Sequence, residues 1–369
     1  MTRYRDLGLT VGQLPPGPGN AITDVGDVRV GVTTLIRGEG TLFVGEGPVR
    51  TGVTVVIPHD DIAHRPVFAG AHRLNGNGEM TGLEWVRESG QLTTPVAITN
   101  THSVGVVRDA LVAEEVARRH GSSFWSLPVV AETYDGALND INGMHVDAEH
   151  LRDALASARG GPVPEGNVGG GTGMICHAFK GGTGTASRTV DGWTVGALVQ
   201  ANHGARERLA VDGVPVGREL GRDRIPSAWD QEEAIDAGAG SIIVVLATDA
   251  PLLPHQLDRI AQRAVIGIGR VGGGGEHSSG DLILAFSTAN AGRLASYKLE
   301  RPSAPVDVTM LPDGMITPLF WAAIEATEEA ILNALIAAET MTGRDGITAH
   351  ALPHDELVAV MTRYTRGPA

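Results

Sequence analysis

Short runs of β-branched residues alternate with longer segments of helical periodicity along most of the chain, and this alternation constrains the fold more than any other feature. A helix with one apolar stripe and a half-buried strand both need a partner layer, so such elements pack as sheets covered by helices. The sequence therefore predicts an α/β fold built in layers. The alternation leaves open whether the strands are parallel, and we find no fixed-period repeat of the solenoid kind.

The expected strands are rich in Val, Ile and Thr. They cover residues 25–36, 51–57, 95–99, 127–131, 194–201, 241–247 and 281–286. The expected helices carry apolar residues three and four positions apart. They cover residues 108–120, 150–159, 254–265, 318–340 and 355–363. The glycine-rich stretch 161–184 is expected to be mostly loop, residues 272–280 to form a second glycine loop, and residues 203–240 to be irregular.

Composition limits the partners that the chain can have. A length of 369 residues, 42% of them hydrophobic, suffices for one large domain or two ordinary ones. A net charge of −14 argues against nucleic acid, which is bound by clustered Lys and Arg. The single cysteine, Cys176, excludes an intrachain disulfide and a zinc site built from several thiolates.

The chain also lacks the patterns of membrane and secreted proteins. Its first residues have no apolar core of a signal peptide, and the longest aliphatic run, residues 242–247, is too short to span a membrane. We therefore expect a cytoplasmic enzyme without a membrane partner.

The sharpest local feature is the junction at residues 236–247, where Asp-Ala-Gly-Ala-Gly leads directly into Ser241 and an aliphatic strand. Small residues permit a strained turn at low steric cost. The Ser241 hydroxyl could then attack the Gly240 carbonyl, and hydrolysis of the ester would release a new N-terminal serine. Its α-amine, with a reference pKa of about 8, could act as the base for its own hydroxyl. A glycine loop entering a core strand is the structural alternative.

Polar side chains stand at the ends of three other expected strands. Ser279 and Asp281, two residues apart, can point the same way and relay a hydrogen bond to a nucleophile. The amide of Asn202 can stabilise an oxyanion without being charged. Glu132 could bind a substrate ammonium, and Tyr134 could donate to a carbonyl oxygen. For each of these residues a turn or strand-end role remains open.

Two further motifs carry less weight. Residues 267–272, Gly-Ile-Gly-Arg-Val-Gly, match G-x-G-x-x-G, but they follow a helical pattern, whereas a dinucleotide site needs a strand before it and a helix after it. His59, Asp60, Asp61 and His64 could gather around a metal, although their spacing fits no common zinc motif.

Several runs, taken together and in order, resemble the DmpA-type family, the L-aminopeptidase/D-amidase-esterases that include β-peptidyl aminopeptidases. The runs cover residues 20–25, 74–82, 99–105, 132–136, 138–140, 179–187, 199–202, 240–244 and 279–290. Each run alone is short and weakly specific. Their joint order from about residue 6 to 340 is what makes the resemblance specific.

The resemblance implies a fold, an activity and a set of roles. The fold would be a four-layer α/β/β/α sandwich, a single domain over residues 1–369, similar to N-terminal-nucleophile hydrolases. Self-cleavage would produce chains 1–240 and 241–369, with Ser241 as the nucleophile. The family's roles fall on Ser279 and Asp281 (supporting hydroxyl and acid), Asn202 (oxyanion), Tyr134 (active-site tyrosine) and Glu132 (substrate amine). Tetramers are expected, and no metal or organic cofactor is needed.

The chain departs from the family pattern at two places. His203 stands where an aromatic residue is expected after the asparagine, which bears on the shape of the pocket. Asp281 is shorter than the Glu that β-peptide-cleaving relatives tend to have, which bears on β-peptide activity. The sequence thus predicts a self-processed aminopeptidase or amidase for short peptides, amides or esters. The alternatives are a hydrolase of ω-amino-acid oligomers on the same scaffold, a nucleotide-binding oxidoreductase, or a non-catalytic homologue.

Overall fold

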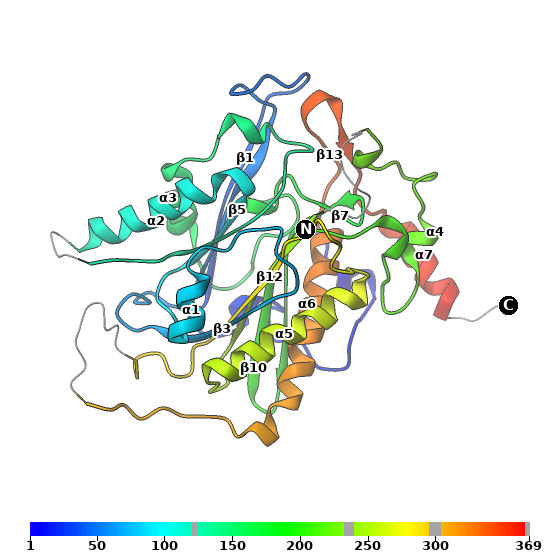
Figure 1. The fold of residues 1–369 in the computed structure, drawn as a ribbon. Coiled ribbons are helices and arrows are strands. Elements are labelled where there is room, and N and C mark those ends of the chain that lie inside the picture. Colours follow the sequence, from blue (N-terminus) through cyan, green and yellow to red (C-terminus); the bar gives the residue numbers. More distant parts are fainter. Residues whose placement is uncertain (120–123, 232–239, 295–303, 366–369) are drawn as a thin grey trace.

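The computed structural model describes residues 1–119, 124–231, 240–294 and 304–365. Two β-sheets lie face to face between two layers of helices (Figure 1). The first sheet has four strands in the spatial order β1 (Arg29–Arg37), β2 (Val49–Ile57), β5 (Val96–Asn100) and β6 (Val129–Thr133). The second has six, in the order β4 (Gln91–Leu92), β3 (Val67–Arg73), β12 (Asp281–Ser287), β11 (Ser241–Thr248), β10 (Trp193–Asn202) and β9 (Gly182–Val190).

Both sheets are mixed. In the first, β5 and β6 are parallel, and in the second, β11 and β12 are parallel, whereas the other strand pairs are antiparallel. Parallel neighbours need a long crossover connection. The crossover from β5 to β6 contains helix α2 (Val104–Arg118), and that from β11 to β12 contains helix α5 (Pro254–Val271).

Helices cover the outer face of each sheet. Helix α2 and helix α3 (Ala148–Ser157) pack on the four-stranded sheet, and α5 and α6 (Thr317–Ile336) pack on the six-stranded sheet. Shorter elements complete the chain: α1 (Leu83–Ser89), α4 (Val216–Glu219), α7 (His354–Thr365), the hairpin β7 (Ile175–Cys176) with β8 (Phe179–Lys180), and the hairpin β13 (Met341–Thr342) with β14 (Thr348–Ala349). The predicted α/β/β/α layering is confirmed.

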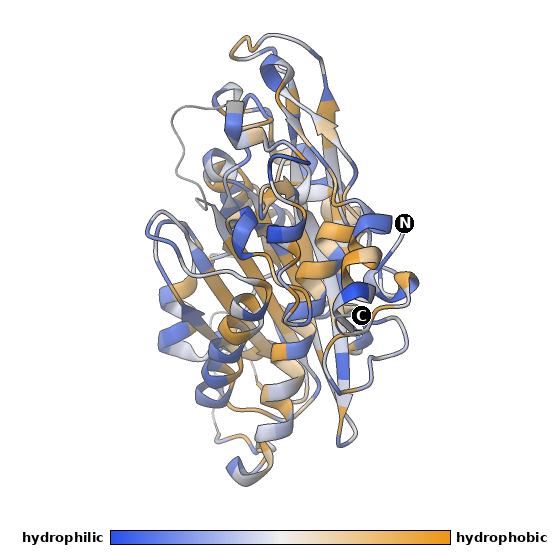
Figure 2. Cartoon of the chain, turned by 90° about the vertical axis from the view of Figure 1, so that its right-hand side faces the viewer, coloured by the Kyte–Doolittle hydropathy of each residue, from blue (hydrophilic) through white to orange (hydrophobic). Residues whose placement is uncertain are grey.

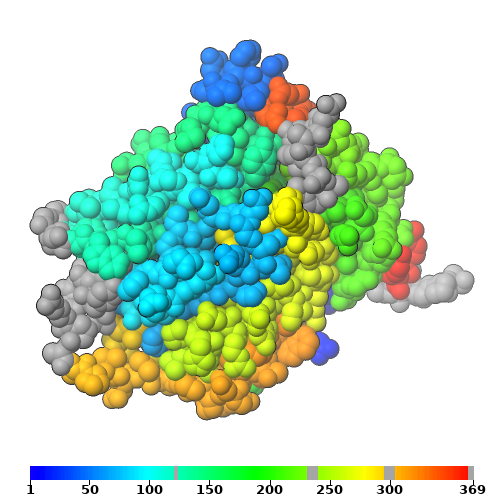
Figure 3. All heavy atoms as spheres, viewed as in Figure 1, coloured from blue at the N-terminus to red at the C-terminus, as the bar shows by residue number. Residues whose placement is uncertain are grey.

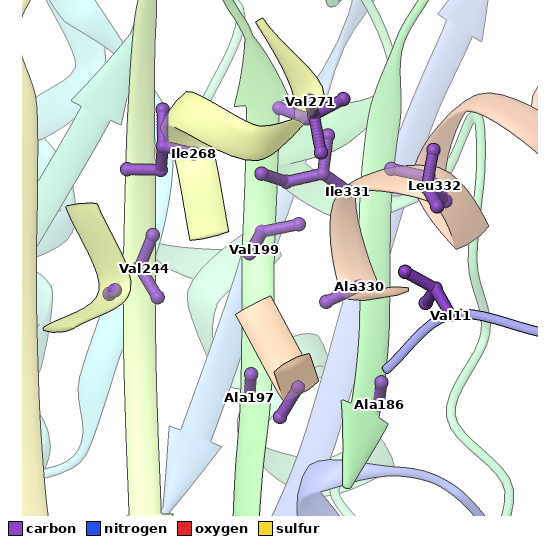
Figure 4. Packing of buried hydrophobic residues seen from close by; sticks show 14 of the residues in the cluster. Val11, Ala186, Ala197, Val199, Val244, Ile268, Val271, Ala330, Ile331 and Leu332 are labelled. Carbon is purple, nitrogen blue, oxygen red and sulfur yellow. The ribbon is translucent and has the colours of Figure 1, made fainter. Parts of the chain in front are cut away.

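The alternation of side chains along β11 shows how the layers are held together. Ile243 and Val245 face the core between the two sheets, and Val244 belongs to the core between the six-stranded sheet and its helices. Figure 4 shows that second core, with Val244 and its strand neighbours facing α5 and α6. Every residue of β11 is buried, and each such aliphatic side chain stabilises the fold by about 1.5–3 kcal/mol. In Figure 2 hydrophobic residues gather on the strands and on the helix faces that meet them.

The structure corrects two boundaries that the sequence predicted. Residues 22–24 form a short 3₁₀ helix and Asp27 has a φ of 66°, so the first strand starts only at residue 29. The sequence predicts that the glycine-rich stretch 161–184 is mostly loop, and the structure places the hairpin β7–β8 and the start of β9, at residue 182, inside it. A Cβ on Gly184 would lie 2.1 Å from the Ala330 carbonyl oxygen, so this glycine serves close packing of a strand on α6.

Strand β3 was missed altogether, because its Phe-Ala-Gly-Ala-His sequence lacks β-branched residues. Helix α5 extends through the G-x-G-x-x-G match, and Gly272 caps its end with a φ of 105°. The structure thus contradicts the alternative of a nucleotide site at residues 267–272, because they lie in the last turns of a helix and not between a strand and a helix.

Candidate active site

Three adjacent inner strands of the six-stranded sheet, β10, β11 and β12, bring predicted site residues together where β10 ends and β11 and β12 begin. Asn202 ends β10, Ser241 begins β11, and these two residues are direct partners in the antiparallel ladder. Asp281 begins β12 and is paired with Ile242 of β11. Residues far apart in the sequence therefore become neighbours through strand pairing.

Ser241 is 6% exposed, and its hydroxyl oxygen accepts a hydrogen bond from the Gly280 backbone N–H at 3.0 Å. Gly240 precedes it with a φ of 145°, and a Cβ there would lie 1.9 Å from the Asn202 carbonyl oxygen. Only glycine fits this position. The small residues 236–239, on which the predicted junction also relied, lie outside the described residues.

Asp281 links the loop before β12 to the start of β11. Its Oδ1 accepts hydrogen bonds from the Ser279 hydroxyl at 2.6 Å and from the Ile242 N–H at 3.2 Å. The Asp281 N–H in turn donates to Asn75 Oδ1 at 2.7 Å. Burial raises the pKa of Asp281 to about 6, against the lowering effect of these hydrogen bonds.

The orientation of the Asn202 amide is fixed by two partners. Its Oδ1 accepts from the Ile175 N–H at 2.7 Å, and its Nδ2 donates to the Tyr134 carbonyl oxygen at 2.9 Å. Because an amide nitrogen carries two hydrogens, one remains available to a group in the pocket that Asn202 lines. A fixed, uncharged donor beside a nucleophile suits an oxyanion.

The four-stranded sheet supplies the opposite wall. Glu132, in β6, is 3% exposed and accepts hydrogen bonds from the Glu79 N–H at 2.9 Å and the Thr101 hydroxyl at 2.5 Å. Burial raises the pKa of Glu132, and these two donors offset part of that rise. Tyr134 follows at the strand end and is 37% exposed. Burial raises the pKa of the Tyr134 phenol as well.

A pocket of about 570 Å³ joins the two walls, a size typical of small-molecule sites. It is lined by Asn77, Gly78, Glu79, Thr101, Glu132, Tyr134, Asn202, Trp229, Gly240, Ser241 and Ser278. In Figure 3 the segment around residues 70–80, in blue, lies beside the yellow segment near residue 280. Ser279 and Asp281 do not line the pocket. Their side chains bond to each other and to the Ile242 N–H, so the predicted relay from Ser279 to the Ser241 hydroxyl is not among the hydrogen bonds of the described residues.

Several contributing residues were not assigned a role from the sequence. Asn75 and Glu79 lie in the run 74–82 and Thr101 in the run 99–105, both of which carry the family resemblance, so the resemblance was the available signal. Trp229 lies in a 3₁₀ turn within a stretch that was expected to be irregular, and no motif marked it. His203, expected to alter the pocket, is 2% exposed and is not among the lining residues.

The aspartates of the possible metal cluster, Asp60 and Asp61, form ion pairs with neighbouring side chains. Asp61 is held by His64 and Arg65, and Asp60 by Arg29. Among the described residues, the side chains near residue 60 do not form a group that could hold a metal ion. Cys176, His177 and His203 form such a group in another part of the fold. No helix within the described ranges is long and apolar enough to cross a membrane.

Comparison with known proteins gives a consistent result. The model of peptidase family S58 matches residues 20–349. A β-peptidyl aminopeptidase, BapA, of Sphingosinicella microcystinivorans is 51% identical over 99% of this chain and 93% of its own. BapA of Sphingosinicella xenopeptidilytica is 44% identical over 97% of this chain and 90% of its own.

Solved structures agree over nearly the whole chain. The L-aminopeptidase D-Ala-esterase/amidase of Ochrobactrum anthropi, described as a prototype of the serine aminopeptidases and a new variant of the Ntn hydrolase fold, is 48% identical with a TM-score of 0.91 and 99% coverage of both chains. A Burkholderia sp. β-aminopeptidase is 52% identical with a TM-score of 0.90 and 98% coverage of both.

Proposed function

The chain belongs to peptidase family S58, and from this premise we propose that Ser241 is the nucleophile of a serine aminopeptidase or amidase. The protein is a hydrolase of that type, as are its relatives by name. One observation carries the assignment of residues: Ser241, Asn202 and Glu132 line one pocket although they come from two sheets.

The proposed reaction uses each wall for one task. The substrate ammonium lies against Glu132, which places the scissile carbonyl at Ser241. The Ser241 hydroxyl attacks that carbonyl and gives its proton to its own α-amine, while Asn202 and Tyr134 donate to the oxyanion. The amine leaving group departs with a proton, and water then hydrolyses the acyl-enzyme. Ser279 and Asp281 hold the start of β11 and β12 in place through the hydrogen bonds described above.

The free α-amine requires cleavage between Gly240 and Ser241. In this step the Ser241 hydroxyl attacks the Gly240 carbonyl, the peptide bond becomes an ester, and water hydrolyses the ester to a carboxylate and a new N-terminus. The positive φ of Gly240 and its contact with the Asn202 carbonyl support an unusual backbone at that bond. The products are chains 1–240 and 241–369.

The two products would remain one domain. Strands β11 and β12 belong to the smaller chain, yet they lie between β10 and β3 of the larger chain in the six-stranded sheet. Separation would break both ladders and expose the apolar residues on both faces. We therefore expect the chains to copurify as a tight heterodimer.

A denaturing mass measurement tests the processing step. We expect two chains in the wild type and one full-length chain in Ser241→Ala. The neighbouring Ser278→Ala, which alters another pocket hydroxyl, is the matched control and should still be cleaved. A wild type that stays full-length yet hydrolyses aminoacyl amides would refute the N-terminal-serine mechanism.

The candidate substrates differ in whether the N-terminal residue to be removed is an α-, a β- or an ω-amino acid. Relatives named for β-peptidyl and for L-aminopeptidase and D-Ala-esterase/amidase activity are similarly identical to this chain. The shorter acid, Asp281, supports α-peptides, amides and esters first, with β-peptides and ω-amino-acid oligomers as second candidates. A panel of matched anilides with α-, β- and ω-amino acyl groups decides between them.

The proposal also covers the oligomeric state of the protein and its place in the cell. The family resemblance supports a tetramer of processed heterodimers, which light scattering on the purified protein tests directly. We also propose a cytoplasmic location, which cell fractionation tests.

A further inference from the structure

A second group of chemically active side chains lies behind Asn202, in the interior. Cys176 comes from β7, His177 from the turn after it, and His203 from the residue following Asn202. One ligand atom from each lies within 4.8 Å of the others, and all three side chains are buried. We call these three residues the thiol–imidazole cluster. None of them lines the active-site pocket.

Each imidazole has a nitrogen atom without a hydrogen-bond partner among the described residues. His177 Nδ1 lies 3.0 Å from the Ala205 carbonyl oxygen, so Nδ1 carries the hydrogen and Nε2 has a lone pair. Within the part of the chain that the structure describes, neither His177 Nε2 nor His203 Nε2 has a partner. His203 Nδ1 lies 3.8 Å from Cys176 Sγ. Because an unpaired buried nitrogen is unfavourable, His177 Nε2 calls for an explanation, and a bound ion would supply its partner.

The backbone around the cluster holds His177 in an unusual conformation. His177 and Ala178 form the two-residue loop between β7 and β8, with φ of 49° and 58°. Such turns favour Asn-Gly, because both central residues need positive φ. The His177 N–H donates to the His203 carbonyl oxygen at 2.7 Å, and Arg206 Nε donates to the His177 carbonyl oxygen at 3.0 Å. The loop is thus fastened to the segment that carries His203.

We propose that the thiol–imidazole cluster binds one Cu(I) ion through Cys176 Sγ, His177 Nε2 and His203 Nδ1. Thiolate and imidazole are ligands for soft and borderline metals, and thiolate favours Cu(I) in particular. Binding converts the thiol to a thiolate with release of one proton, and it leaves both imidazoles neutral. The hydrogen bond from His177 Nδ1 to a carbonyl oxygen is the usual outer support of a metal-bound histidine.

The surrounding charges favour a monovalent ion over Zn²⁺. Lys180 is buried, and its Nζ donates to the carbonyl oxygens of Met174 and Gly181 at 2.8 Å each. The Arg206 guanidinium packs against the same turn. The cluster contains no carboxylate. Cu(I) with one thiolate is neutral, whereas Zn²⁺ would leave a net positive charge close to the Arg206 guanidinium in a medium of low dielectric constant.

The ion would also bear on the active site. The Ile175 N–H, one residue before Cys176, orients the Asn202 amide, and His203 directly follows Asn202. A metal that joins Cys176 to His203 therefore braces both sides of the oxyanion residue. His203 stands where the family resemblance implies an aromatic residue, so a relative with an aromatic residue there would lack this ligand.

Copper binding is tested on the purified protein. Protein from copper-supplemented cells is purified without oxygen, passed over a desalting column and analysed for copper and zinc by mass spectrometry. We expect one copper per chain, and a thiolate-to-copper charge-transfer band in the near ultraviolet. Competition with bathocuproine disulfonate then ranks the affinity of each variant for Cu(I).

Two variants separate the ligands from the fold. His203→Phe keeps a ring of similar size, and Cys176→Ser keeps a small side chain. We expect each to weaken Cu(I) binding at least about tenfold, while circular dichroism and the melting temperature establish that each folds. His64→Ala, which changes an exposed histidine, is the matched control and should retain full copper.

Three results would overturn the proposal: no copper in the wild type, equal copper in folded Cys176→Ser, or one zinc per chain in place of copper. Copper content does not depend on Ser241, so Ser241→Ala should bind Cu(I) as the wild type does. A failure of the copper site is therefore distinguishable from a failure of the proposed hydrolase mechanism.

Discussion

The two sheets contribute differently to the pocket. The four-stranded sheet supplies Glu132 and Tyr134 from β6, with Thr101 following β5. The six-stranded sheet supplies Asn202 and Ser241 from β10 and β11. The first wall carries a carboxylate and hydroxyls, which suit recognition of an amine, and the second carries the proposed nucleophile and the proposed oxyanion donor.

The hydrogen bonds of the two walls differ in the same way. Glu132 is held by donors from loops, the Glu79 N–H and the Thr101 hydroxyl. The Ser241 hydroxyl accepts from the N–H of Gly280, the residue before β12, and the Asp281 carboxylate accepts from the N–H of Ile242 in β11. The bond from Asn202 Nδ2 to the Tyr134 carbonyl oxygen joins the two walls. In the proposed mechanism Glu132 recognises the amine on one layer and Ser241 and Asn202 act from the other, with Tyr134 reaching the oxyanion from the recognition side. Substitutions of Glu132 should therefore affect mainly KM, and those of Ser241 or Asn202 mainly kcat.

The largest effect should come from the nucleophile. Ser241→Ala removes the attacking oxygen, and we expect kcat/KM for an aminoacyl anilide to fall by about 10⁴-fold or more. Ser278→Ala, on the same pocket, should change it by no more than a few fold. Comparable losses in the two variants would place the chemistry elsewhere.

The oxyanion donor should come next. Asn202→Ala removes a hydrogen bond that strengthens as charge develops, and we expect kcat to fall by about 10²–10³-fold. KM should change little, because the substrate amine is bound on the other wall. Steady-state kinetics on already processed protein give both values, and a rise in KM alone would contradict the division between the walls.

On the recognition wall, Glu132→Gln should act mainly through KM. A charge-assisted hydrogen bond contributes about 1.5–3 kcal/mol, or roughly 10–150-fold in kcat/KM. The loss should vanish with an N-acetylated substrate, because that substrate carries no ammonium. Thr101→Val, which removes one donor to Glu132, is the companion variant and should show a smaller rise in KM.

The pKa of Asp281 predicts a pH effect on stability. Burial raises it from 3.8 to about 6, so the folded protein favours the protonated acid. The associated stabilisation is complete below about pH 4 and is lost as the pH rises through about 6. An Asn side chain cannot ionise. In the Ser241→Ala background, the melting temperature of the Asp281→Asn variant should therefore rise relative to that of the protein with Asp281 as the pH increases from 4 to 7. A constant difference over that range would argue against the raised pKa.

The smallest effect should come from the pocket rim. Glu79 is exposed and adds a second carboxylate near Glu132. Exposed charges contribute little, so Glu79→Gln should lower kcat/KM for a doubly cationic substrate by only a few fold, and less in high salt. An effect as large with a substrate of single charge would show that Glu79 acts through its neighbours instead.

The sequence predicted well where one local signal decided the outcome. The aliphatic run after Ser241 is β11, and the amphipathic segment that starts at residue 254 is α5. Prediction failed where packing overrode local preference. Gly184 looked like a loop residue but lies in a strand against α6, and β3 has too few β-branched residues to be recognised.

By itself, the sequence determined the layered α/β architecture, the strand that Ser241 begins, and the polar residues at the strand ends, because periodicity and residue type are local properties. Only the tertiary structure decided which of those ends meet. Strand pairing places Asn202 beside Ser241, and packing of one sheet on the other places Glu132 across the pocket. The same packing turns His203 toward Cys176 and away from the substrate, since long-range contacts fix where each side chain can point.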